Sequence, residues 1–292
     1  MKEMYFFDPQ NTTVFIGYDT VESRSNSLSI IYNDRYEERI ILEEGDLCKI
    51  IIDISPFFPV HNSQISDMGW IHNDNIMLKV IDVDFTDEGN FFHSVECKHS
   101  GSLQVGDRVF THIDTMRREN ISRNHTAAHL LYCALRDDFG EKINGYCSCA
   151  SDDKLCFDFL SHSMPSKEQI YSLEKRVNAY IMSDYPVLTY MTSGKHGEEI
   201  CSVKPVNCHN HGVATKNENL CSHHASRITH HDSHINPDRK VRICQIGDIS
   251  CEVCEGTHCI HTGDIGMFKI TSLLDKRDGS FRLEAITVNS NR

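Results

Sequence analysis

Two pairs of metal-binding side chains, more than a hundred residues apart, constrain this chain more than any other feature. His125 and His129 lie within Arg-Asn-His-Thr-Ala-Ala-His-Leu-Leu, and Cys254 and His258 lie within Cys-Glu-Gly-Thr-His. Side chains at positions i and i+4 share a face of a helix, so the first pair can direct two imidazoles at one point. A thiolate and a third imidazole complete a tetrahedral zinc site. The sequence therefore predicts one zinc ion that ties two distant segments together.

The abundance of histidine and cysteine leaves other interpretations open. The chain has 18 histidines and 13 cysteines, so some pairs at this spacing arise by chance. A local zinc knuckle with the spacing Cys-x2-Cys-x3-His-x2-His is an alternative, formed by Cys251, Cys254, His258 and His261. This knuckle would leave His125 and His129 without a role. The four-residue set itself fits either a closed structural zinc or a catalytic zinc with a coordination position open to water.

The composition favours a cytoplasmic globular protein. Hydrophobic residues make up 39% of 292 positions, enough for two domains, and no apolar run is long enough to span a membrane. The first residues lack a signal-peptide pattern, and 13 cysteines, an odd number at metal-like spacings, favour reduced thiols. The formal net charge of -13 disfavours strong unaided binding to nucleic acid, and DNA is not an expected partner.

The amino-acid sequence divides into two parts with different hydrophobic patterns. Short β-runs separated by Asn, Asp and Gly turn signals occupy residues 12–109, which predicts a small β-barrel. Helical and then β patterns follow, with strands dominating residues 241–287. We therefore predict a barrel domain at residues 1–112 and a second, α+β domain at residues 113–292.

Two helices are predicted in the second part. The first begins after Asp114, with Asp114 or Asn124 as its cap. The second begins near Ser166, whose spacing to Gln169 is that of a capping box, and it ends before Pro186.

The sequence around both ligand pairs carries more than the ligand spacing. Residues 123–131 and 252–258, followed by residues 262–270, resemble the metal-binding motifs of the alanyl-tRNA synthetase editing domain and of the related free-standing alanyl-tRNA editing proteins. The resemblance extends along nearly the whole chain in the family's order. Its other segments are residues 15–20, 52–58, 64–69, 105–107, 155–159 and 283–287.

This resemblance implies a fold, an activity and a partner. The implied fold is a β-barrel of the translation-factor type followed by the α+β editing domain shared with threonyl-tRNA synthetase. The implied activity is zinc-dependent hydrolysis of tRNA(Ala) mischarged with serine or glycine, an aminoacyl-tRNA hydrolase reaction. The implied partner is the acceptor end of tRNA(Ala). A separate alanyl-tRNA synthetase catalytic fragment is a second expected partner.

The chemistry expected of the motifs is ester hydrolysis. Zincin proteases have Glu directly after the first histidine of His-Glu-x-x-His, whereas position 126 is Thr, which argues against peptide hydrolysis. A zinc ion with an open position lowers the pKa of a bound water towards about 7, so water can attack an aminoacyl ester. The backbone N–H groups of Gly256 and Thr257 are candidates for stabilising the oxyanion. The expected catalytic residues are His125, His129, Cys254, His258 and Thr257, and the expected substrate or tRNA contacts are Gln64, Arg117, Arg118, Arg123 and Gly256.

The chain departs from the family's pattern near the expected substrate. The loop that resembles Glu-Ser-Gly-Gly-Gln reads Val60-His61-Asn62-Ser63-Gln64, and Cys-Gly-Gly-Thr-His has become Cys-Glu-Gly-Thr-His. We expect these departures to weaken the selectivity for serine. Two interpretations of them remain open: loss of hydrolytic activity and neutral sequence drift. The departures are Asn62, Ser63, Gly145, Cys156 and Glu255.

Residues 196–240 form an insertion rich in histidine and cysteine, where the family has a short connection. The insertion has no helical or strand period, which predicts a solvated loop. A second zinc ion is one interpretation of its composition, and low-complexity expansion is the other.

Two further functional readings remain alongside the hydrolase. The chain could be a detached piece of alanyl-tRNA synthetase that assists alanine–tRNA ligation by a separate protein. It could also be a non-catalytic adaptor that binds zinc or tRNA. Deacylation of mischarged tRNA separates the hydrolase from the adaptor.

Overall fold

The chain forms two compact units. The computed structural model describes residues 12–61, 63–86, 89–140, 146–161, 163–194, 196 and 240–288. One unit consists of Met1–Val60 and Ile65–Arg118, and the other consists of His61–Gln64 and Glu119–Arg292. Within the described ranges, no helix is both long and apolar enough to cross a membrane.

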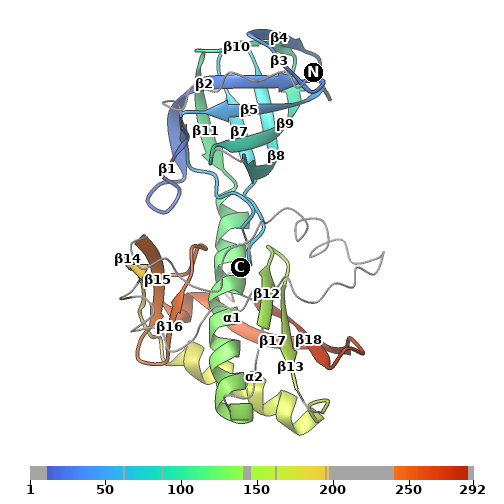
Figure 1. The fold of residues 1–292 in the computed structure, drawn as a ribbon, viewed down its shortest axis with the longest axis vertical. Helices are drawn as coiled ribbons and strands as arrows, with labels where there is room; N and C mark the ends of the chain where they lie inside the picture. Colours follow the sequence, from blue (N-terminus) through green and yellow to red (C-terminus); the bar gives the residue numbers. More distant parts are fainter. Residues whose placement is uncertain are drawn as a thin grey trace. The chain divides into compact units, whose positions relative to one another are not determined.

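The first unit is a closed β-barrel (Figure 1). Six antiparallel strands pair in the order β11-β7-β8-β9-β5-β2, and β11 pairs again with β2 to close the ring. Closure pairs the backbone groups that an open sheet would expose at its edges. The expected barrel is therefore present. The strands are β1 (Val14–Phe15), β2 (Glu22–Tyr32), β3 (Arg35–Tyr36), β4 (Arg39–Leu42), β5 (Leu47–Ile52), β6 (Ile54–Ser55), β7 (Gly69–His72), β8 (Met77–Phe85), β9 (Phe91–His99), β10 (Gly101–Gln104) and β11 (Arg108–Ile113).

Alternation of side chains fills the barrel. In β11, Val109, Thr111 and Ile113 are buried, while the residues between them are exposed. This is the period-2 pattern of a strand with one face on the core. The outward positions remain available for other functions.

One histidine lies inside the apolar core of the barrel. His93 on β9 is fully buried, with its Nδ1 3.1 Å from the carbonyl oxygen of Ile50 and its Nε2 2.8 Å from the hydroxyl of Ser55. Nδ1 therefore donates to the carbonyl, and Nε2 accepts from Ser55. Burial lowers the pKa of His93 from 6.5 to about 4.

The free energy of unfolding of the first unit should fall as the pH drops from 6.5 to about 4. The unfolded chain protonates this histidine near pH 6.5, whereas the folded barrel resists protonation until about pH 4. The unfolded state thus binds more protons in that window, and the loss approaches roughly 3 kcal/mol at its lower end. Urea unfolding at several pH values checks this. His93→Gln should flatten the dependence, and His99→Gln, an exposed histidine on the same strand, should not; an unchanged dependence in His93→Gln would contradict the assignment.

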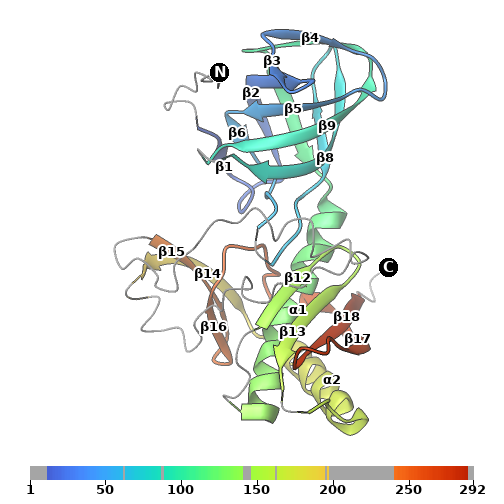
Figure 2. The same ribbon diagram turned by 45° about the vertical axis from the view of Figure 1, so that its right-hand side comes forward.

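In its described residues, the second unit combines the helices α1 and α2 with two antiparallel sheets (Figure 2). The larger sheet has the order β12-β13-β18-β17, and α1 and α2 pack against it through one apolar cluster. The smaller sheet has the order β14-β15-β16. The predicted helix–strand mixture is confirmed. The elements are α1 (Thr115–Phe139), β12 (Tyr146–Ala150), β13 (Leu155–Leu160), α2 (Lys167–Met182), β14 (Val187–Ser193), β15 (Lys240–Ile246), β16 (Ser250–Val253), a 3-10 turn (Thr262–Ile265), β17 (Met267–Asp275) and β18 (Ser280–Val288).

Both helices begin where their capping residues lie. Asp114 Oδ1 accepts from the backbone N–H of Arg117, 3.0 Å away, at the start of α1. Ser166 Oγ accepts from the N–H of Gln169, and the Gln169 side chain accepts from the N–H of Ser166, so the capping box predicted for α2 is confirmed. Asn124, the other candidate cap, lies inside α1 and donates to the Ser151 carbonyl.

Candidate metal centre

Helix α1 presents the two histidines of the first pair side by side. The rings of His125 and His129 have centroids 5.3 Å apart and planes only 7° from parallel, as expected for side chains one turn apart. Cys254 follows β16 directly, and His258 lies in the loop after it. One ligand atom from each of the four residues lies within 4.8 Å of all the others. The structure therefore brings together the two pairs that the sequence singled out.

Three of the distances among these atoms are close to the edges of a tetrahedral zinc site, and all four atoms lie within 4.8 Å of one another. His129 Nε2 and His258 Nε2 are 3.1 Å apart, and Cys254 Sγ lies 3.4 Å from His125 Nε2 and 3.5 Å from His258 Nε2. Zinc bonds of 2.0–2.1 Å to nitrogen and 2.3 Å to sulfur give tetrahedral edges of about 3.3 Å and 3.6 Å. The donor set fits a metal ion of this size.

Hydrogen bonds fix which nitrogen of His125 faces the other ligands. The side-chain oxygen of Gln64 accepts from the backbone N–H of Thr257 at 2.8 Å, which identifies that atom as the amide oxygen. His125 Nδ1 lies 2.8 Å from the same oxygen and must donate to it. The lone pair of neutral His125 is therefore on Nε2, the nitrogen that faces Cys254. Such an outer hydrogen bond is typical of metal-bound histidine.

A buried carboxylate has the same effect on His129. Glu252 Oε1 lies 3.0 Å from His129 Nδ1, and Glu252 also accepts from Ser250 Oγ at 2.8 Å. Burial opposes protonation of His129, but Glu252, together with the Cys244 and Cys254 thiols, outweighs it and raises the pKa well above 6.5. The site thus attracts positive charge, and a metal ion would take the place of the proton on Nε2.

The other two ligands are also tuned by this environment. Burial disfavours the Cys254 thiolate, yet His125 and His258 outweigh it and hold the pKa of this thiol well below 9.0. Burial lowers the pKa of His258 to about 3. Its Nδ1 is buried and has no hydrogen-bond partner among the described residues. A neutral imidazole and a thiolate are the ligand forms that zinc requires.

Gly256 is required by the close approach of the ligand loop to His125. A Cβ at this position would lie 2.0 Å from His125 Cε1 and 2.3 Å from His125 Nδ1. The guanidinium of Arg242 holds the loop by donating to the carbonyls of Cys254 and Gly256, at 3.2 and 2.7 Å. The glycine of the motif therefore serves ligand packing.

Residues of the segment His61–Gln64 line the same site. The Ser63 hydroxyl is 3.3 Å from His125 Nε2, and the His61 Nε2 atom is 3.1 Å from a Glu255 carboxylate oxygen. Asn62, between them, lies outside the described residues. Two departures from the family's pattern, Ser63 and Glu255, therefore bear directly on the metal centre.

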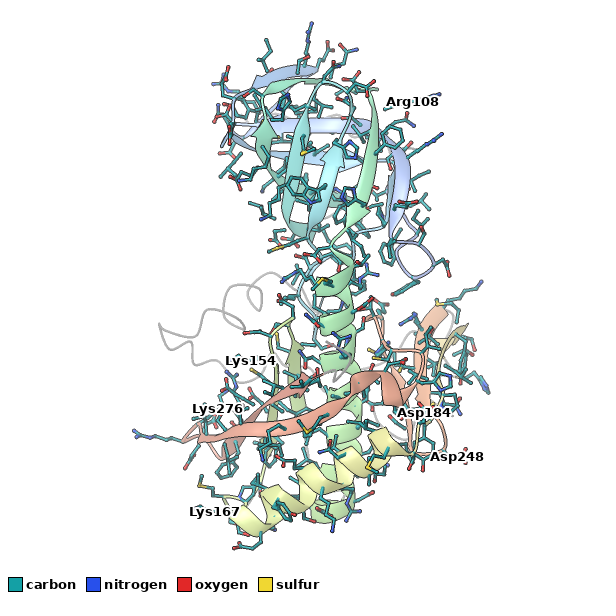
Figure 3. The ribbon with its side chains drawn as sticks, turned by 180° about the vertical axis from the view of Figure 1, so that it is seen from behind. Arg108, Lys154, Lys167, Asp184, Asp248 and Lys276 are labelled. Carbon is teal, nitrogen blue, oxygen red and sulfur yellow. The ribbon has the colours of Figure 1, made fainter. Side chains whose placement is uncertain are left out.

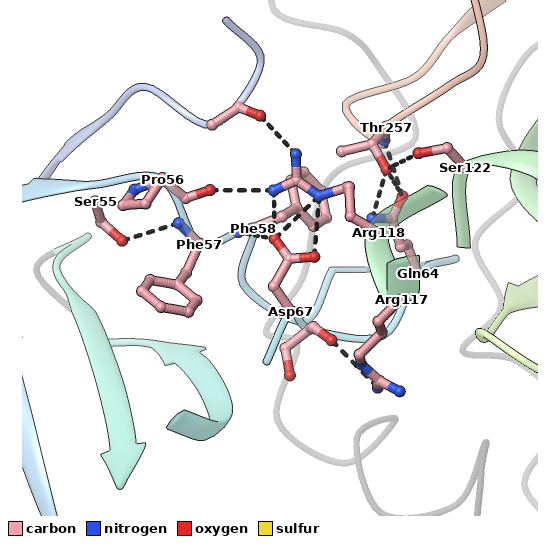
Figure 4. A network of polar contacts seen from close by, with 12 residues as sticks. Ser55, Pro56, Phe57, Phe58, Gln64, Asp67, Arg117, Arg118, Ser122 and Thr257 are labelled. Carbon is pink, nitrogen blue, oxygen red and sulfur yellow. Dashed lines mark hydrogen bonds and ion pairs between the residues drawn. The ribbon is translucent and has the colours of Figure 1, made fainter. Parts of the chain in front are cut away.

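Thr257 belongs to a buried network of hydrogen bonds (Figure 4). Its N–H donates to Gln64, and its hydroxyl accepts from Ser122 at 2.8 Å and from Gln64 Nε2 at 3.0 Å. The Thr257 N–H is engaged and does not face an open position. The Thr257 N–H positions Gln64 and, through it, His125. Its expected stabilisation of an oxyanion stays a prediction.

Arg117 and Arg118, two of the expected tRNA contacts, form hydrogen bonds within the first unit. Arg118 belongs to the first unit, where it pairs with buried Asp67 and donates to the carbonyls of Gly17 and Pro56 (Figure 4). Arg117 lies half-buried and donates to the Ser66 carbonyl at 3.4 Å. The Arg118 guanidinium is thus engaged by its own unit, and its expected contact with tRNA stays a prediction.

Arg123 is buried as well. It lies on α1 with 7% of its surface exposed, 3.8 Å from a Glu119 oxygen and in contact with Asn120. The expected contact of Arg123 with tRNA likewise stays a prediction. Cys156 is buried on β13, while Gly145 and nearly all of the insertion at 196–240 lie outside the described residues.

Glu252 and Arg242 are the site residues that the sequence did not single out. Glu252 precedes Cys254 by two residues at the end of a strand, where positions i and i+2 share a face. This spacing was the available signal for Glu252. Arg242 offered no such signal, because its partners are backbone carbonyls of another segment.

Two family models of aminoacyl-tRNA synthetases match parts of this chain. Residues 241–284, which carry Cys254 and His258, match the model of the "Threonyl and Alanyl tRNA synthetase second additional domain". Residues 3–117 match the model of "tRNA synthetases class II (A)".

Within that class the relatives are alanine–tRNA ligases. Those of Thermoanaerobacter sp. (strain X514) and Caldicellulosiruptor saccharolyticus are each 34% identical, over 275 and 277 residues. That of Alkaliphilus oremlandii is 31% identical over 282 residues. The matches cover 94%, 95% and 96% of this chain but 28% of each relative. The chain belongs to the family of alanyl-tRNA synthetase editing-type domains, and it spans just over a quarter of the length of these relatives.

Proposed function

We propose that this chain hydrolyses tRNA(Ala) mischarged with serine or glycine, using a zinc ion held by His125, His129, Cys254 and His258. The observation that carries the proposal is the convergence of three Nε2 atoms and one thiol sulfur, with their outer atoms held by Gln64 and Glu252. Membership in an editing-type family supports the substrate class.

The proposed organisation has two domains. Residues 1–112 would be a barrel domain of the translation-factor type, and residues 113–292 the editing domain shared with threonyl-tRNA synthetase. The proposed setting is the cytoplasm, with the acceptor end of tRNA(Ala) as partner. An alanyl-tRNA synthetase catalytic fragment is a second proposed partner.

The reaction is addition of water to the aminoacyl ester carbonyl, followed by cleavage of the bond to the ribose oxygen. A zinc ion held by His125, His129, Cys254 and His258 would supply Lewis acidity for the attack of water on the ester carbonyl. The chain's own residues hold the geometry: Gln64 orients His125, and Glu252 orients His129. Glu252 is engaged on His129 and Ser250, so its role is orientation of a ligand.

Single-turnover hydrolysis of seryl-, glycyl- and alanyl-tRNA(Ala) tests the proposal. Mischarged tRNA should decay faster than alanyl-tRNA, with weak selectivity because Ser63 lies at the site. Cys254→Ala should reduce the rate to background. Cys251→Ala is the matched control, since this neighbouring cysteine is outside the four-ligand set and should leave the rate near wild type.

A closed structural zinc is the competing function. Four protein donors are enough to fill a tetrahedron, and such a site would support an adaptor or a ligase-assisting fragment. Background decay of all three substrates, with metal bound and the fold intact, would overturn the hydrolase in favour of that function.

A further inference from the structure

The outer surface of the barrel carries rings and cations in register across four strands. Phe110 on β11 is paired with Arg24 on β2 and with His72 on β7. One row further, Trp70 on β7 is paired with His112 on β11 and with Lys79 on β8. We call this set the aromatic face: Arg24, Trp70, His72, Lys79, Phe110 and His112.

The rings of this face contact one another. His72 stacks on Phe110 with centroids 5.8 Å apart and planes 24° from parallel, and His112 meets His72 edge-on at 5.8 Å. The Arg24 guanidinium lies 5.3 Å from the Phe110 centroid. Phe110 is nevertheless 42% exposed. A large ring on the solvent side of a barrel strand makes no contribution to the core, and exposed clusters of this kind mark binding surfaces.

The charge of this face is opposite to that of the chain. Arg24, Lys79 and Arg108 have no ion-pair partner within the described part of the chain, whose full sequence has a net charge of -13. Arg108 lies two residues before Phe110 on β11, and its side chain points away from the barrel (Figure 3). The carboxylates in these rows are Glu22, opposite His112, and Glu96, which pairs with Lys98. Unpaired cations beside exposed rings suit a polyanion that also offers flat bases.

We propose that the aromatic face binds a single-stranded segment of RNA. Bases would stack on Phe110, His72 and Trp70, and the phosphates would contact Arg24, Lys79 and Arg108. Stacking accepts any base, so this binding is tolerant of sequence. Rings interleaved with cations fit bases and phosphates better than they fit an apolar protein patch. The surface belongs to the first unit and extends the proposed function, because it would hold RNA through residues other than those of the metal centre.

The full-length protein offers a direct probe of this surface. Trp70 is the single tryptophan of the chain, so its fluorescence reports on the aromatic face alone. Titration with a ten-nucleotide oligoadenylate RNA should quench it. Phe110→Ala should weaken binding about tenfold, and Phe110→Tyr should restore it. In the wild-type protein, three phosphate contacts should give a slope of log affinity against log salt of about -2. Arg24→Ala should make this slope shallower.

Controls separate the face from general effects. Tyr36→Ala and Arg39→Ala change exposed residues of the same unit, of similar size and charge, and should bind like wild type. Equal affinity in wild type and Phe110→Ala, or no quenching, would overturn the proposal. So would sedimentation showing a dimer that Phe110→Ala dissociates, because the face would then bind a second copy of the chain. If the protein deacylates mischarged tRNA but does not bind the oligonucleotide, only the RNA-binding proposal is rejected. If it binds the oligonucleotide but does not deacylate tRNA, only the proposed hydrolase activity is rejected.

Discussion

Replacing His125 and His129 together by alanine should remove the metal ion and destabilise the second unit. The wild-type protein is expected to hold about one zinc per chain, and the double variant none. Three imidazole nitrogens and a sulfur converge on a buried point, and two hydrogen-bonded partners fix the imidazole orientations. Structural zinc contributes on the order of 10 kcal/mol in small domains, so its loss should lower the unfolding midpoint by roughly 10 °C or more.

Elemental analysis and thermal unfolding with and without a chelator measure this effect. The chelator should destabilise wild type and leave the double variant unchanged. His61→Ala is the matched control, because His61 lies near the site in a contact with Glu255 but supplies no ligand. One equivalent of zinc in the double variant would place the metal elsewhere, in the Cys251–Cys254 knuckle or in the insertion at 196–240.

The ligand set follows from local spacing, and for that reason it could be predicted. His125 and His129 are one helical turn apart, and the cap at Asp114 marks the start of that helix. Cys254 and His258 share a short loop whose glycine is demanded by contact with His125. Each of these features depends on only a few neighbouring residues, so it can be predicted from sequence periodicity and motif spacing.

The supporting residues depend on contacts between distant segments. Glu252 and His129 are 123 positions apart in sequence, and only the packing of β16 near α1 makes them neighbours. Arg118 and Arg123 lie on one helix, but tertiary packing places the first against Asp67, with 11% of its side chain exposed, and buries the second within the second unit. Residue type and local period do not specify which face of a long helix is covered, since Asp67 and the buried core come from elsewhere in the chain.

Gly256→Ala should cost about as much activity as removing a ligand, although it alters no ligand. The added Cβ would lie 2.0 Å from His125 Cε1 and 2.9 Å from the Gln64 side-chain oxygen. The loop cannot easily retreat, because Arg242 donates to the Gly256 carbonyl and the next N–H donates to Gln64. The His125 ring must therefore shift by about 1 Å, a displacement that costs roughly a hundredfold in rate at a catalytic site.

The measurement is single-turnover deacylation together with zinc affinity for the same protein preparation. Gly256→Ala should lose roughly a hundredfold in rate and bind zinc about ten- to a hundredfold more weakly, with its far-ultraviolet circular dichroism unchanged. Glu255→Ala is the matched control, since it alters the adjacent, largely exposed side chain of the same loop and adds no atom beside His125. Wild-type rate and zinc affinity in Gly256→Ala would show that the loop yields, and that His125 does not depend on the close packing of this glycine.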